Sequence, residues 1–114
     1  MTDARSMFEN CSKLTTIDST MIRIEDGTRM FYDCSSIEVF TPFVSSLTWG
    51  DYMFTNCSKL CYFNQHLTNL VRATSMFENC KELKIWENKT EKLEDGTKMF
   101  KSSGISGYYL RKSD

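Results

Sequence analysis

The chain has 114 residues, 40% hydrophobic and 25% charged, with a formal net charge of -1 at pH 7. These values are typical of one folded domain and exclude wholesale disorder. No Lys/Arg block exceeds two residues, so binding of nucleic acid or of an anionic membrane surface is not predicted. No apolar run approaches the ~18 residues of a membrane span, and the first residues lack the basic start and apolar stretch of a secretory signal peptide.

A single phrase, Met-Phe with a Cys three residues later, recurs along the chain. The Met-Phe pairs begin at residues 7, 30, 53, 76 and 99, each 23 residues after the last. A Leu or Ile follows each Cys by three residues, and a bulky apolar residue follows it by six. The Cys column itself consists of Cys11, Cys34, Cys57 and Cys80, with Ser103 in the fifth place. A constant period of this length predicts a solenoid, a propeller or an array.

The length of the unit decides among these architectures. A unit of 23 residues is too short for a four-stranded propeller blade or a two-helix repeat. It fits a leucine-rich-repeat solenoid, with one short parallel β-strand per coil and a turn or short helix on the return side. β-Branched and aromatic residues favour strands at 14–18, 37–41, 60–64 and 83–87. A column of Gly or Ala before each Met-Phe pair is expected to supply the turn that leads into it.

One such coil cannot bury its own Met, Phe, Cys and Leu side chains, so copies must stack and bury them against each other. We expect a single solenoid domain over residues 1–114, with about five coils near 2–24, 25–47, 48–70, 71–93 and 94–114. The sequence suggests no capping coil at either end. We therefore expect the ends to be covered by other subunits or by a larger parent chain.

The repeated unit, Leu-x-x-Gly-x-x-Met-Phe-x-x-Cys-x-x-Leu, resembles the BspA-like leucine-rich repeats of bacterial surface proteins. The resemblance implies a non-enzymatic repeat module for protein or glycan binding, of the surface adhesion type, at the cell surface or outside the cell. Similar repeats in phage-encoded proteins imply an alternative: a structural component of a phage virion (a decoration, fibre or tail protein) or of another multi-subunit assembly. The chain departs from the family eight residues after each Cys, where the usual apolar residue is replaced by Ser19, Pro42, Gln65 and Asn88.

The cysteines and the single histidine are the residues that could carry chemistry. The strict spacing of the Cys column places its members in a line, one per coil, whereas a zinc site needs clustered ligands. We interpret the column as buried thiols and Cys61, which lies outside it, as the most reactive thiol. The pattern places no nucleophile beside His66. We therefore predict no catalytic residue, no metal site and no cofactor.

The variable positions of the predicted strands are the best candidates for a binding surface. Side chains alternate along a strand, so if the sixth residue after each Cys points inward, the fifth and seventh point outward. Repeat proteins use such a surface for partners, here a protein or glycan. Strand propensity on an exposed face is the alternative interpretation. The candidate binding residues are Thr16, Asp18, Val39, Thr41, Tyr62, Asn64, Ile85, Glu87 and Tyr108.

Overall fold

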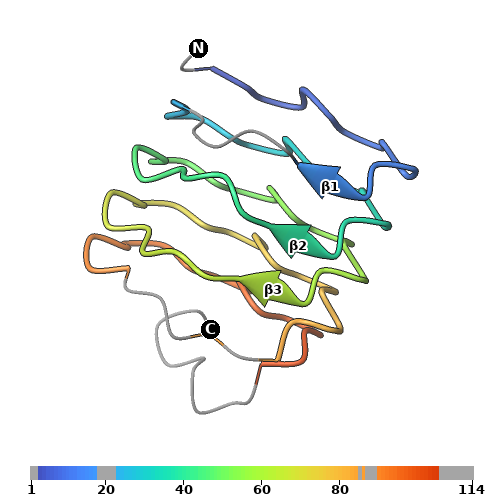
Figure 1. The fold of residues 1–114 in the computed structure, drawn as a ribbon. Coiled ribbons are helices and arrows are strands. Elements are labelled where there is room, and N and C mark those ends of the chain that lie inside the picture. Colours follow the sequence, from blue (N-terminus) through green and yellow to red (C-terminus); the bar gives the residue numbers. More distant parts are fainter. Residues whose placement is uncertain (1–2, 18–22, 85, 87–89, 106–114) are drawn as a thin grey trace.

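The computed structural model describes residues 3–17, 23–84, 86 and 90–105. The chain winds into a stack of coils, with three short strands side by side on one face (Figure 1). These are β1 (Thr16–Ile17), β2 (Val39–Phe40) and β3 (Tyr62–Phe63). They pair in parallel in the order β1-β2-β3, with Thr16 opposite Val39 and Val39 opposite Tyr62. The register of the sheet therefore follows the 23-residue step of the sequence.

The strands are shorter than the five residues predicted for each. Cys61 N and Tyr62 N both donate to the carbonyl of Glu38, at 2.9 and 3.3 Å, so two residues of one coil oppose a single residue of the coil before it. This bulge-like pairing interrupts the regular ladder and bends the chain. A second row of parallel bridges lies elsewhere on the coils, at Asp3, Asp26, Trp49, Arg72 and Asp95. The predicted strand at 83–87 lies partly outside the described residues.

The return side of each coil is built from consecutive tight turns. Met30 N donates to Gly27 O at 2.9 Å and Cys34 N donates to Phe31 O at 3.1 Å. The third residue of each turn, Arg29 or Asp33, has a positive φ of 57° or 62°, as in a type II turn. Among the described residues there is no helix, and so none long and apolar enough to cross a membrane.

The Gly column begins the predicted turns and has a second role that the sequence did not indicate. No glycine in the described part of the chain has a positive φ, because the left-handed position falls two residues later. A Cβ built on Gly27 would lie 3.0 Å from Met53 Sδ, and one on Gly50 would lie 3.1 Å from Met76 Sδ. These glycines begin the turns, but what they supply is room for the Met side chain of the next coil. The predicted turn is therefore present, and it is the need for space that explains the small residue at its first position.

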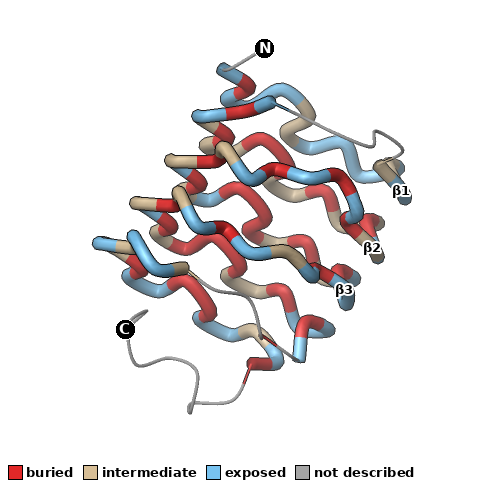
Figure 2. Tube along the Cα trace, turned by 60° about the vertical axis from the view of Figure 1, so that its left-hand side comes forward, coloured by how far each residue is buried: buried red, intermediate tan, exposed pale blue. Residues whose placement is uncertain are grey.

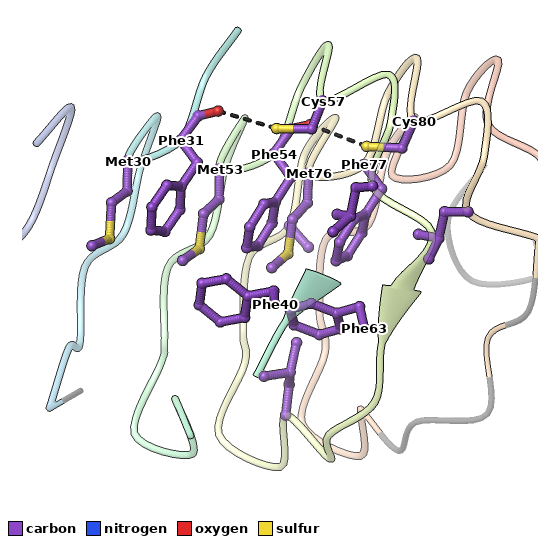
Figure 3. Close-up of a cluster of buried hydrophobic side chains, with 14 of the residues drawn as sticks. Met30, Phe31, Phe40, Met53, Phe54, Cys57, Phe63, Met76, Phe77 and Cys80 are labelled. Atoms are coloured by element: carbon purple, nitrogen blue, oxygen red, sulfur yellow. Dashed lines mark hydrogen bonds between the residues drawn. The ribbon is translucent and has the colours of Figure 1, made fainter. Parts of the chain in front are cut away.

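Two columns of aromatic rings form the centre of the core. In the first, consecutive rings stack at centroid distances of 5.5, 5.4, 5.3 and 5.8 Å along Phe8, Phe31, Phe54, Phe77 and Phe100. In the second, the distances are 5.6 and 5.9 Å along Phe40, Phe63 and Trp86. Phe54 also meets Phe40 and Phe63 edge-on, so the columns interlock. Met30, Met53 and Met76 form a parallel row beside them (Figure 3).

Candidate functional site

The outward face of β1, β2 and β3 carries the predicted binding residues that the structure describes. Thr16 and Tyr62 are exposed, Tyr62 by 48%, while Val39 is half-buried. The next residues along, Phe40 and Phe63, are only 1% and 4% exposed. Side chains therefore alternate across the sheet as expected, with buried Phe rings on the inner side and variable residues on the outer side. Buried and exposed positions alternate along the coils in Figure 2.

Polar groups extend this face beyond the strands. Thr41 and Asn64 are both exposed, and Asn64 Nδ2 donates a hydrogen bond of 3.3 Å to the Tyr62 hydroxyl. A phenol ring, an amide and hydroxyls thus lie next to each other on the two neighbouring coils. The other predicted binding residues lie outside the described part of the chain: Asp18, Ile85, Glu87 and Tyr108.

Three of the four cysteines in the column have a structural role. Cys34, Cys57 and Cys80 are fully buried, as predicted. Each thiol donates to the carbonyl of a Phe in the preceding coil, at 3.0, 3.2 and 3.1 Å for Phe8, Phe31 and Phe54 (the last two in Figure 3). Burial raises the pKa of Cys34 to about 11 and that of Cys80 to about 12, and it also raises the pKa of Cys57. Neutral, hydrogen-bonded thiols are poor nucleophiles, and the role that the structure gives these three is to join neighbouring coils.

Two cysteines lie at the surface. Cys61 is exposed, and its thiol donates to the carbonyl of Glu38 at 3.4 Å. Cys11 is also exposed, which the prediction of a uniformly buried column missed. In the described part of the chain no three His, Cys, Asp or Glu side chains gather closely enough to hold a metal ion.

Sequence reasoning missed a ladder of side chains directly before the cysteines. Asn56 Nδ2 donates to Asp33 Oδ1 at 2.6 Å, and Asn79 Nδ2 donates to Asn56 Oδ1 at 2.7 Å. All three residues have a positive φ, of 62°, 66° and 64°. Asn and Asp tolerate this conformation better than most residues, so their recurrence before Cys was the available signal.

Gln65 explains one departure from the family pattern. Its side-chain amide donates to Pro42 O at 2.7 Å, and its Oε1 accepts a hydrogen bond from Val44 N at 2.8 Å. The polar residue at this position therefore replaces apolar packing with two hydrogen bonds to the preceding coil. This departure serves the fold.

The comparisons with known proteins agree with this architecture. A family model described as the BspA type leucine-rich repeat region matches residues 4–106 in six copies. Searches among curated proteins and among solved structures gave no match. The family match spans the parallel sheet, the aromatic columns and the buried cysteines. The chain belongs to the BspA-type leucine-rich-repeat family.

Proposed function

We propose that this chain is a non-enzymatic repeat module that binds a protein or glycan partner on the outward face of its sheet. The observation that carries the proposal is the exposure of Tyr62. Its side chain is 48% exposed, whereas the neighbouring rings of Phe40 and Phe63 are buried in the core. An exposed aromatic side chain on a strand that packs against a buried core offers contact area at little cost in conformational entropy. Solenoids of this kind work through the surface that their repeats present, here as one domain over residues 1–114.

The polar neighbours of Tyr62 suit a partner rich in hydrogen-bonding groups. Asn64 is exposed and its amide is oriented by the Tyr62 hydroxyl, while Thr16 and Thr41 add hydroxyls on nearby coils. Peptides and sugars both combine apolar surfaces with hydrogen-bonding groups. BspA-type repeats are typically associated with surfaces, which supports a place at the cell surface or outside the cell.

The test compares two exposed tyrosines on different sides of the coil. The purified chain is screened against a glycan array and a panel of extracellular proteins, and any hit is measured with Tyr62→Ala. We expect the affinity to fall by roughly tenfold, since an interface aromatic commonly contributes more than 1 kcal/mol. Tyr52, 38% exposed on the Met-Phe side, provides the matched control, and Tyr52→Ala should bind as the parent does. Equal binding by both variants would refute the sheet-face site.

A further inference from the structure

A shallow hollow lies beside the start of β3, where Cys61 directly precedes Tyr62. It measures about 300 Å³ and is lined by Glu38, Lys59, Cys61, Glu82 and Lys84. Glu38 stands one repeat before Cys61 and Lys84 one repeat after it. The short Cys61 side chain therefore leaves a gap between a longer anionic and a longer cationic neighbour.

The charges around this hollow are poorly satisfied within the chain. Neither Glu38 nor Lys59 forms an ion pair with any other residue that the structure describes. Lys84 Nζ lies 3.8 Å from Glu82 Oε2, and both of these side chains are more than half exposed. Such an exposed pair contributes little to folding. Two carboxylates and two ammonium groups cancel, so the hollow does not select an ion of either sign. A complementary surface must carry the same alternation of charges.

The arrangement is self-complementary. If a second copy is turned by 180° about an axis that runs along the strands through Cys61, its coils stack in the opposite direction. Glu38 then faces Lys84 of the second copy, and Lys84 faces its Glu38. A twofold axis always repeats a contact in this way. Lys59 then lies one coil away from Glu82 of the second copy.

We propose that the sheet face docks a second copy of this chain in this antiparallel arrangement, with the two Cys61 side chains meeting at the twofold axis. The inference rests on the proposed function, since it names a partner for the same face. The whole molecule extends 31 × 25 × 19 Å, so one face offers a small interface. Interfaces below roughly 1,200 Å² are weak and transient, and exposed charge pairs are screened by salt. We therefore expect a weak dimer that dissociates further at high ionic strength.

Cysteine crosslinking tests the geometry. Cys11→Ser removes the other exposed thiol, and the variant is treated with a short bis-maleimide in low salt, at about 100 μM protein where a weak dimer is populated. We expect a crosslinked dimer through Cys61. The collision control is Cys61→Ser with Cys11 retained, which should give no crosslinked dimer. The buried thiols of Cys34, Cys57 and Cys80 are not accessible to the reagent.

A charge swap tests the pairing itself. In the Cys11→Ser background, Glu38→Lys places a lysine opposite Lys84 of the second copy on each side of the axis. Like charges across an interface repel, so this variant should crosslink roughly tenfold more slowly. Adding Lys84→Glu exchanges the signs and should restore crosslinking. Both residues are exposed, so the variants should fold, which circular dichroism verifies.

Three results would overturn the proposal: crosslinking unaffected by Glu38→Lys, no recovery in the swapped variant, or equal crosslinking through Cys11. Tyr62-dependent binding of an external ligand without a dimer would leave the binding function standing and reject the dimer. A charge-dependent dimer with no external ligand would support the dimer and reject an external protein or glycan partner for this face.

Discussion

The side-chain amide of Asn56 donates a 2.6 Å hydrogen bond to Asp33 Oδ1, and these two residues stand one repeat apart. Asn56 also accepts from Asn79 Nδ2 at 2.7 Å, so it lies in the middle of a chain of side-chain hydrogen bonds. Its φ of 66° is a conformation that costs most residues free energy. Asn56 thus adopts the backbone conformation that the turn within its coil requires, and its side chain also forms the hydrogen bonds between coils.

Replacing Asn56 should separate these two contributions. Asn56→Ala should lower the free energy of unfolding by about 1–3 kcal/mol, because it leaves Asp33 and Asn79 without their partner. Asn56→Gly loses the same hydrogen bonds but favours the left-handed backbone, so its loss should be smaller by up to about 1 kcal/mol. Urea denaturation measures both, and equal losses would show that the backbone conformation contributes nothing.

Phe54 lies in the middle of the first column of stacked rings. It lies between Phe31 and Phe77 at 5.4 and 5.3 Å and meets two more rings edge-on. Phe54→Ala should destabilise the fold by about 3–5 kcal/mol, since it removes a buried ring and leaves a cavity. Phe43 is 63% exposed, so Phe43→Ala should change stability by no more than about 0.5 kcal/mol. Comparable losses in thermal or urea denaturation would contradict the interlocked core.

The space above Gly27 should tolerate one carbon and no more. Ala4 and Ala73 occupy the same position of the repeat, and both are buried. Gly27→Ala should therefore be tolerated, with Met53 shifting slightly. Gly27→Val should cost about 1–3 kcal/mol, because a branched side chain would overlap Met53 and Leu47. A neutral Gly27→Val in urea denaturation would refute the packing role of this column.

The buried thiols predict a loss of stability in alkali. The pKa of Cys34 is raised to about 11 and that of Cys80 to about 12, above the ordinary value of 9.0, because burial disfavours the thiolate. The unfolded chain therefore loses these protons first. Stability should be unaffected below pH 9 and should fall as the pH rises toward 11 and 12. Urea midpoints between pH 8 and 11 measure the slope, and Cys34→Ala should make it shallower; an unchanged slope would contradict the assignment.

The thiols should also differ in their rates of modification. Cys11 and Cys61 are exposed, whereas Cys34, Cys57 and Cys80 are fully buried and hydrogen-bonded. A thiol reagent at neutral pH should therefore modify two of the five cysteines rapidly in the native protein, and all five after denaturation. Mass spectrometry of the modified peptides identifies them. Rapid labelling of Cys57, the middle thiol of the column, would show that the stack opens readily.

Much of the fold followed from spacing. The step from Val39 to Tyr62 equals the sequence period, and the structure pairs these two residues in parallel register. The burial of Phe40 and Phe63 beneath the exposed Tyr62 followed from side-chain alternation. The role of the Gly column did not follow, because a glycine required for space and one required for a positive φ look the same in a sequence.

The candidate site was predicted only in outline. Alternation placed Thr16, Thr41 and Asn64 outside, and the structure exposes them. The hydrogen bond from Asn64 to the Tyr62 hydroxyl and the hollow around Cys61 could not be predicted, because they depend on side-chain conformations and on the lengths of neighbours one repeat away.

By itself the sequence determined the period, the identity of the core columns and the repeat family, because a residue that must stack on its own copy has to recur at a constant step. Only the tertiary structure decided how each column acts: that the cysteines donate to Phe carbonyls, that the Asn and Asp residues form a ladder, and that Gly27 makes room for Met53. The reason is physical. Repetition records which residues meet, whereas the direction of a hydrogen bond and the free space around a side chain exist only once neighbouring coils are packed.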